Sequence, residues 1–203
     1  MANANLEITQ KSELLTDWLS ANASQIPGIH KLIRKLESER KAGHVVHAFM
    51  VKRLVEDGTF KITHVEKSTG SHDIDIELDG SINLQVWHGA SSAADNMRDK
   101  DKSSPLGGVE VDWERDEQNL LAKLRQLPED APGFLVCYDY RTGLHILPEW
   151  RASFPENKAL LELYYVRDDT GLFNESRLHC SGVFKHDELA HRISNSLGFH
   201  LKG

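Results

Sequence analysis

The chain has 203 residues, of which 39% are hydrophobic and 27% are charged, and this composition excludes disordered, collagenous and fibrous proteins. Its formal net charge of -7 argues against a protein that coats nucleic acid nonspecifically. No apolar run approaches the roughly 18 residues that span a bilayer, and the N-terminus lacks the basic and apolar regions of a signal peptide. We therefore expect a cytoplasmic protein with no membrane partner.

Apolar residues recur at helical spacing in three segments of the first sixty residues. This pattern predicts helices over about 9–23, 29–43 and 44–57. Pro27 and Gly28 separate the first two helices, and Gly43 is a suitable left-handed cap for the second. Gly58 is expected to end the third, and the valines of this segment leave a strand as the alternative.

From residue 60 onward, apolar residues alternate with polar ones, which is the period of a half-buried strand. The expected strands cover 60–66, 72–78, 82–88, 133–138, 160–166 and 176–180, with helices at 116–126 and 186–197. Residues 89–112 have no period and predict a long loop. The order of elements predicts a mixed α/β (α+β) fold with a central sheet flanked by helices. We expect one globular unit, with 1–42 as an N-terminal helical appendage and 43–203 as the α/β domain.

The stretch from His72 to His88 is the most informative part of the chain, because its alternation fixes how two strands pair. A two-residue turn at Asp79 and Gly80 would mix polar and apolar side chains on both faces of the hairpin. A three-residue loop, 79–81, keeps one face apolar. It pairs Ile74 with Val86, Ile76 with Leu84 and Leu78 with Ile82, and on the other face Asp73 with Trp87, Asp75 with Gln85 and Glu77 with Asn83.

This register places three carboxylates, those of Asp73, Asp75 and Glu77, on one face of one strand, about 7 Å apart. Carboxylate and amide oxygens are the ligands that Mg²⁺ prefers, so Asp73, Asp75 and Gln85 form a candidate magnesium site. A metal there would lower the pKa of an attacking water and offset the charge of a phosphodiester. The alternative is the solvated face of an edge hairpin, where alternating acids are common.

The order helix, strand, hairpin with Asp on its first strand, helix, strand resembles the core of the PD-(D/E)XK, or restriction-endonuclease-like, nucleases over about residues 43–140. The resemblance implies Mg²⁺-dependent cleavage of DNA, with Asp73 or Asp75 as the metal-binding Asp of the second core strand. Gln85-Val86-Trp87 stands where this family has an acidic residue, any residue and Lys. Gln85 can still offer an oxygen, but Trp87 cannot replace a lysine.

A nuclease with this motif needs a cation from elsewhere in the chain, and the candidates are Lys52, Arg53, His88 and Lys100. Basic residues are concentrated near the N-terminus, since residues 1–67 carry a net charge of +2 and residues 68–203 carry -9. The candidate contacts to nucleic acid are Lys31, Arg34, Lys35, Lys52 and Arg53, in a segment that also holds Arg40 and Lys41. The alternative for this segment is the solvated face of one or two helices.

Histidines and cysteines supply weaker signals. His44 and His47 are three residues apart, a spacing known from metal sites, but no third ligand can be assigned, so we expect surface or helix-terminal positions for both. A loose C-terminal group, His179, Cys180, His186 and His191, is a weak candidate for zinc, because a zinc site needs three or four converging ligands. Cys137 and Cys180 are expected to be buried thiols.

Two functions from different classes fit the sequence. The first is a divergent nuclease-like protein in which Asp73, Asp75 and Gln85 hold Mg²⁺ and Glu77 assists through water, or a nucleic-acid-binding remnant of such an enzyme. The second is a noncatalytic module that binds a protein partner, or a second copy of itself, through the acidic sheet face and the loop at 89–112.

Overall fold

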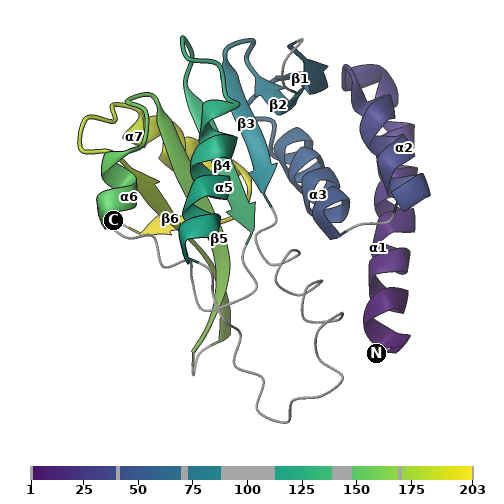
Figure 1. Ribbon diagram of the computed structural model, residues 1–203. Helices are drawn as coiled ribbons and strands as arrows, with labels where there is room; N and C mark the ends of the chain where they lie inside the picture. Colours follow the sequence, from purple (N-terminus) through teal and green to yellow (C-terminus); the bar gives the residue numbers. More distant parts are fainter. Residues whose placement is uncertain are drawn as a thin grey trace.

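The computed structural model describes residues 2–39, 42–69, 73–87, 113–138, 148–168 and 171–202. These residues form a seven-stranded mixed sheet in which the strands lie side by side in their order along the chain (Figure 1). The strands are β1 Ile62–Ser68, β2 Asp73–Leu78, β3 Ile82–Trp87, β4 Gly133–Tyr138, β5 Lys158–Asp168, β6 Gly171–Cys180 and β7 His200–Lys202.

Strand direction changes at both ends of the sheet. The first three strands are antiparallel neighbours, whereas β3, β4 and β5 are parallel to one another. Strands β5 and β6 form a long antiparallel hairpin, and β7 adds parallel to β6. Parallel neighbours need a crossover, and the helix between β3 and β4 is part of the connection that supplies it.

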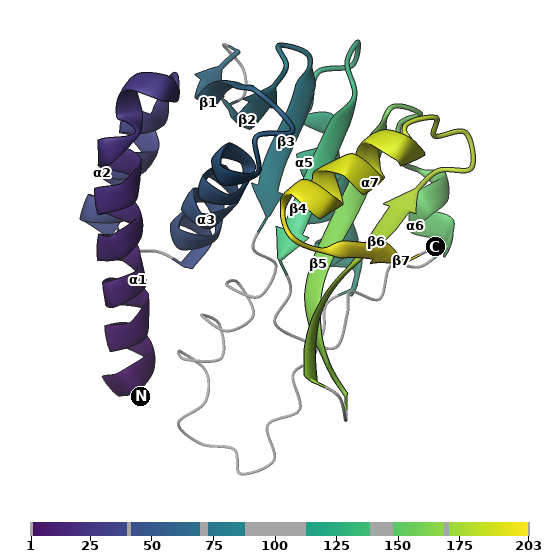
Figure 2. The same ribbon diagram turned by 180° about the vertical axis from the view of Figure 1, so that it is seen from behind.

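Helices cover both faces of the sheet, as Figures 1 and 2 show from opposite sides. The helical elements are α1 Ala2–Ala21, the 3-10 turn η1 Ala23–Gln25, α2 Ile29–Glu39, α3 Ala42–Asp57, α5 Trp113–Arg125, α6 Pro148–Ala152 and α7 Asp187–Ser196. One apolar cluster joins α1, α2, α3 and α7 to one face, and a second joins α5 and α6 to the other. The predicted mixed α/β fold with a helix-flanked sheet is therefore confirmed.

Strand β4 shows why its sequence is continuously apolar. Phe134 and Val136 belong to the first cluster, whereas Leu135 and Cys137 belong to the second. Both faces of this central strand are buried, so polar residues have no position to occupy.

The β2–β3 hairpin has the predicted register over the three pairs next to the loop, and the other three predicted pairs lie beyond the ladder. Ile76 pairs with Leu84, Glu77 with Asn83 and Leu78 with Ile82, which leaves the three-residue loop 79–81. Asp79 and Gly80 both adopt positive φ, of 51° and 77°, and the Asp79 carboxylate accepts a hydrogen bond from the Lys61 N–H at 2.9 Å. The loop therefore uses two left-handed residues, which turns the chain without breaking the alternation of apolar residues.

Several predicted boundaries were wrong, and each error has a local cause. Helix α1 begins at Ala2 rather than near residue 9. Gly43 is not a cap: it lies in the first turn of α3, which starts at Ala42, after α2 ends at Glu39. Helix α6 and strand β7 were not predicted, because five and three residues are too short to show a period. The predicted loop 89–112 lies outside the described residues.

The N-terminal helices share the main apolar core. Leu15 and Leu19 of α1, with Leu32 and Leu36 of α2, belong to the same cluster as the sheet residues. Helix α2 lies against β1, and the Val65 N–H donates to the Pro27 carbonyl at 2.8 Å. This contact caps the outer edge of β1 and brings α2 next to the sheet edge at which the acidic residues lie.

Candidate metal site

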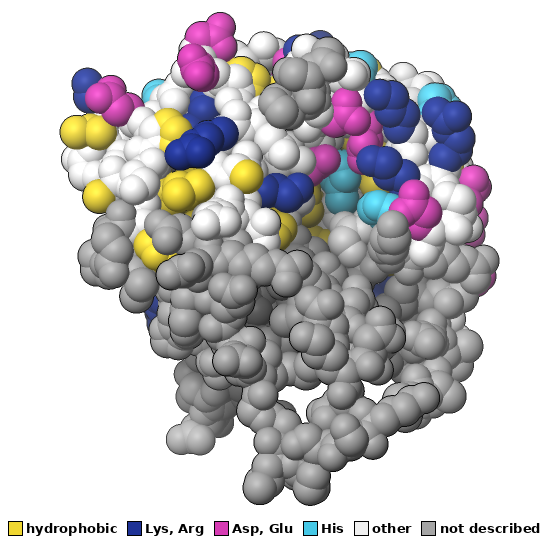
Figure 3. Space-filling model, in the orientation of Figure 1, with side chains coloured by type: hydrophobic (Ala, Val, Ile, Leu, Met, Phe, Trp, Pro, Cys, Tyr) yellow, Lys and Arg dark blue, Asp and Glu magenta, His cyan; other side chains and the backbone are white. Residues whose placement is uncertain are grey.

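Three ligand-type side chains meet where α3 packs beside the β1–β2 edge of the sheet. They are His47 of α3, Glu66 of β1 and Asp75 of β2, and their ligand atoms all lie within 4.8 Å of one another. Figure 3 shows histidine, acidic and basic side chains gathered over this part of the molecule. We refer to these three residues as the site triad.

Glu66 has an unusual backbone conformation within its strand. Its φ of 56° is left-handed, which costs of order 1–3 kcal/mol for a residue other than glycine and persists only where the surroundings hold it. The surroundings here are two lysines of α2, since Lys31 Nζ donates to the Glu66 carbonyl at 3.0 Å and Lys35 Nζ contacts Glu66 Oε2 at 2.5 Å. The strained residue is thus held from outside the sheet.

The Glu66 carboxylate is charged although its side chain is only 2% exposed. Burial by itself raises the pKa of a carboxyl group. In Glu66 this effect is outweighed by hydrogen bonds and charge from His47 and Lys35, which lower its pKa to about 2. The triad therefore contains one carboxylate that stays ionised throughout the neutral and weakly acidic range.

His47 links the other two members of the triad. Its Nδ1 lies 3.4 Å from Glu66 Oε1, and its Nε2 lies 3.2 Å from the main-chain carbonyl of Asp75. The prediction of a surface or helix-terminal position was wrong for this residue, because the His47 side chain is buried at 5% exposure. Its helix packs directly on the sheet, and the ring faces inward.

The Asp75 carboxylate is oriented by the neighbouring strand. The Val86 N–H of β3 donates to Asp75 Oδ2 at 2.7 Å. Burial raises the pKa of Asp75, and the charge of His47 and the Val86 hydrogen bond offset part of that rise. A nearby cation would stabilise the ionised form of this partly compensated carboxyl group.

Gln85 of β3 offers a further candidate oxygen on the strand beside Asp75. Continuing the β2–β3 register by one residue places Gln85 opposite Asp75, on the same face of the hairpin. Its side chain is 7% exposed, and its amide oxygen Oε1 is buried with no hydrogen-bond partner. A buried unpaired acceptor costs about 1–3 kcal/mol, and a cation would remove that cost.

The donor set suits a divalent metal ion. The triad combines two carboxylates and an imidazole, and Gln85 offers an amide oxygen on the neighbouring strand. This set holds more nitrogen than the all-oxygen set predicted for Mg²⁺. Manganese accepts oxygen ligands together with imidazole more readily than magnesium does. Of the predicted ligands Asp73, Asp75 and Gln85, the structure places Asp75 in the triad, and the hairpin register extended by one residue places Gln85 opposite it.

The other two predicted acidic residues have different surroundings. Asp73 is exposed at the start of β2 and is not a member of the triad. Glu77, predicted to assist through water, forms an ion pair with Lys67 and accepts a hydrogen bond from Thr63 Oγ1 at 2.9 Å. Burial by itself would raise the pKa of Glu77. The hydrogen bonds from Lys67 and Thr63 and the charge of Lys67 lower it by more, so the pKa of Glu77 is below its usual value.

The predicted polar wall of the hairpin is not an open surface. Glu77, Asn83 and Gln85 are all less than a tenth exposed. A partner protein would find few exposed carboxylates on this face of the hairpin.

The predicted nucleic-acid contacts divide into two groups. Lys31 and Lys35 reach Glu66, and Arg34 lies between them in sequence on the exposed side of α2. Lys52 and Arg53 lie on α3, where Lys52 pairs with Glu56 and lies 5.1 Å from the Trp18 ring centre, and Arg53 lies against Gly198. Arg40, Lys41, His88 and Lys100 lie outside the described residues.

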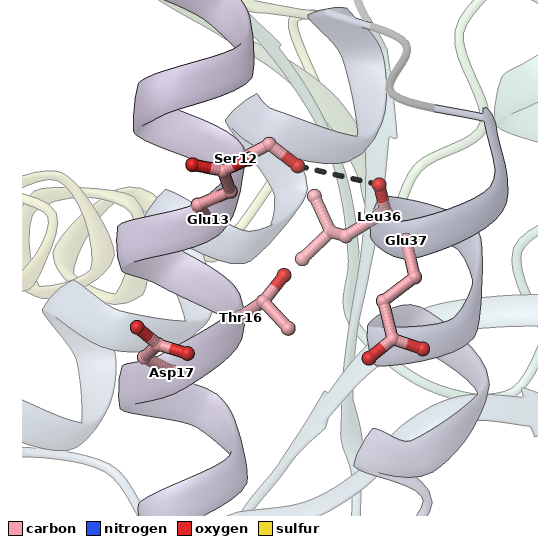
Figure 4. A pocket seen from close by; sticks show the side chains of 6 residues that line it. All are labelled: Ser12, Glu13, Thr16, Asp17, Leu36 and Glu37. Atoms are coloured by element: carbon pink, nitrogen blue, oxygen red, sulfur yellow. Dashed lines mark hydrogen bonds between the residues drawn. The ribbon is translucent and has the colours of Figure 1, made fainter.

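A small hollow of about 150 Å³ lies between α1 and α2, and it does not form a second site. It is lined by Ser12, Glu13, Thr16, Asp17, Leu36 and Glu37. Figure 4 shows that the carboxylates of Glu13 and Asp17 point away from that of Glu37, while Ser12 Oγ donates to the Leu36 carbonyl at 3.3 Å. The acidic groups do not converge on a ligand position.

Sequence reasoning missed Glu66 and discounted His47. The only signal for His47 was its spacing from His44, and Glu66 stood alone at the end of a predicted strand. In the C-terminal group, His179 is buried and its Nε2 lies 2.9 Å from Glu162 Oε2, so this histidine pairs with an acid that the sequence did not single out.

The chain matches no protein-family model, no curated protein and no solved structure at the level of a significant similarity. None of the described helices is both long enough and apolar enough to span a membrane.

Proposed function

We propose that this chain is a divergent restriction-endonuclease-like protein that cleaves phosphodiester bonds of DNA with a divalent cation. The observation that carries the proposal is the convergence of His47, Glu66 and Asp75, from one helix and two strands, within 4.8 Å. The unpaired amide oxygen of Gln85 supports it, because it is a buried acceptor without a partner on the strand beside Asp75.

The order of elements also supports the proposal. Helix α3, strand β1, the β2–β3 hairpin, helix α5 and strand β4 follow one another as in the nucleases that the sequence resembles. Asp75 lies on the first strand of the hairpin, where these nucleases have their metal-binding Asp, and Gln85 lies on the second. A shared order of elements supports a fold relationship more strongly than an activity, so the activity depends on the triad.

The reaction places demands that these residues meet. In phosphodiester hydrolysis, the hydroxyl of a water ends on phosphorus, the bond to the leaving oxygen breaks, and the proton of the water ends on that oxygen. A bound cation supplies a more acidic water and offsets charge on the phosphate. Asp75, Glu66 and the Gln85 amide would hold the cation. His47 would complete the set or orient Glu66.

The arrangement of basic residues fits DNA as the substrate. The whole chain is acidic, but Lys31, Arg34 and Lys35 lie on α2, which packs beside the triad. A backbone phosphate approaching the triad would meet these charges first.

The test is a plasmid-nicking assay with purified protein in the presence of Mg²⁺ or Mn²⁺. The wild type should nick supercoiled DNA with one of these cations and not with EDTA. Asp75→Asn should lower the rate by roughly a hundredfold or more, because several kcal/mol of metal stabilisation are lost.

Asp73→Asn is the matched control, because it removes an acid of the same type two residues away that lies outside the triad. It should leave the nicking rate within a few-fold of the wild type. Nicking that is equally fast in both variants, or that persists in EDTA, would remove the proposal.

A further inference from the structure

A nuclease of the proposed type needs a positive charge beside its metal, and the motif position for it holds Trp87. That side chain is partly buried against the second apolar cluster and carries no charge. Two of the cations predicted to replace it, Lys52 and Arg53, are engaged with Glu56 and Gly198 in other parts of the fold. His88 and Lys100 lie outside the described residues, and among the described residues the charge comes from another element.

Helix α2 supplies a lysine next to the triad. Lys31 and Lys35 lie one turn apart on the same face of this helix, and both ammonium groups reach Glu66. They differ in what they bind. Lys31 binds the main-chain carbonyl and holds the left-handed backbone, whereas Lys35 binds the carboxylate at 2.5 Å.

Lys35 is placed between the triad and solvent. Its side chain is 38% exposed, while that of Glu66 is 2% exposed, so the ammonium group lies at the outer boundary of the cluster. A cation that takes the Glu66 carboxylate would leave the Lys35 ammonium free to turn to a neighbouring anion. Because the side chain is flexible and has three donors, it can do so without moving α2.

We infer that Lys35 donates to a non-bridging oxygen of the bound phosphodiester and provides the positive charge that the Gln85-Val86-Trp87 segment lacks. This inference rests on the proposed function. It makes helix α2 part of the catalytic machinery rather than of an appendage. Lys31 and Lys35 of α2 hold Glu66, and Lys35 also supplies the positive charge for the phosphate.

Lys123 is the alternative source of the positive charge beside the triad. The charge of Lys123, on α5, lowers the pKa of Asp75, so this residue also acts on the site. Lys35 differs from it in making a direct contact with a triad carboxylate. Variants of both residues therefore belong in one experiment.

The experiment measures nicking rate and Mn²⁺ affinity separately, for the full chain and for Lys35→Met, Lys35→Arg, Lys123→Met and Lys185→Met. Titration calorimetry measures Mn²⁺ binding without DNA. Lys35→Met should lower the nicking rate by roughly a hundredfold and leave Mn²⁺ affinity equal to or tighter than the wild type, because a competing ammonium is gone. Lys35→Arg should restore at least a tenth of the rate.

Lys185→Met, at an exposed lysine between β6 and α7, controls for the general loss of one positive charge and should stay within a few-fold of the wild type. Thermal unfolding of Lys35→Met and Lys35→Arg identifies any loss of fold. Two results would overturn the inference while leaving the proposed function intact. In the first, the wild type nicks DNA and Lys35→Met nicks it at the same rate. In the second, the nicking rate falls in Lys123→Met and in no other variant. A fall in Mn²⁺ affinity that accounts for the whole loss of rate would also overturn it, because Lys35 would then only position Glu66. A wild type that does not nick with any cation would remove both proposals.

Discussion

The main-chain N–H of Val86 donates to the carboxylate of Asp75, at 2.7 Å, rather than to a carbonyl of the facing strand. The paired part of the hairpin runs only as far as Ile76 and Leu84, and this side-chain contact follows immediately. An aspartate thus takes over a hydrogen bond of the sheet where β2 and β3 begin to separate. The contact fixes one carboxylate oxygen and leaves the other available to a ligand.

The unpaired oxygen of Gln85 leads to a prediction about stability. Gln85→Met keeps the volume of the side chain and removes a buried acceptor that has no partner. Without added metal, this variant should be more stable than the wild type by about 1 kcal/mol, as measured by denaturant unfolding. The same variant should bind Mn²⁺ more weakly. A loss of stability with unchanged Mn²⁺ affinity would mean that the amide has a structural partner and no ligand role.

The imidazole in the triad leads to a prediction about cation preference. Mn²⁺ should bind at least roughly tenfold more tightly than Mg²⁺, because Mg²⁺ favours oxygen ligands and the triad includes a nitrogen. His47→Gln replaces the ring with an amide and should narrow this difference. Calorimetric titration of both proteins with both cations measures it. Equal preference in the two proteins would show that His47 orients Glu66 and does not bind metal.

The charge of Glu66 leads to a prediction about acid stability. Its pKa is about 2 in the folded protein and 4.5 when unperturbed, so folding is favoured by about 3 kcal/mol above pH 4.5. This contribution is lost as the pH falls from 4.5 to 2, because both states become protonated. Glu66→Gln lacks it at every pH.

The measurement is urea unfolding in EDTA at several pH values. The wild type should exceed Glu66→Gln by about 3 kcal/mol at pH 7, and the two curves should approach each other as the pH falls toward 2. A gap that stays constant from pH 7 to 2 would contradict the assigned ion pairs with Lys35 and His47.

The junction between α2 and β1 leads to a prediction about glycine. Gly28 has a φ of 82°, and a Cβ there would lie 2.0 Å from the main-chain oxygen of Val65. Gly28→Ala should therefore destabilise the protein by more than about 2 kcal/mol, and it should displace the lysines of α2 from Glu66. Gly182→Ala is the control, because a Cβ there has open space and should change stability by less than about 0.5 kcal/mol. Similar melting temperatures for the two variants would contradict the close packing of α2 on β1.

The hairpin and the central strand could be predicted because their signals are local. Alternation of Ile74, Ile76 and Leu78 with acids favours one register, because a shift by one residue would mix polar and apolar side chains on both faces of the hairpin. The apolar run 133–138 likewise allowed only a strand buried on both faces. From these two features the sequence established a mixed sheet and placed Asp75 and Gln85 together.

Tertiary structure alone decided the rest of the triad and its lysine clamp. The residues involved come from three elements: Lys31 and Lys35 from α2, His47 from α3 and Glu66 from β1. No period in the sequence relates one of these elements to another. Their meeting depends on the close approach of α2 to β1 at Gly28, on the inward face of α3, and on a left-handed residue within a strand. Patterns along a chain record which face of each element is apolar. They do not record how two elements approach each other, and that approach determines which polar side chains can bind one another or a common ligand.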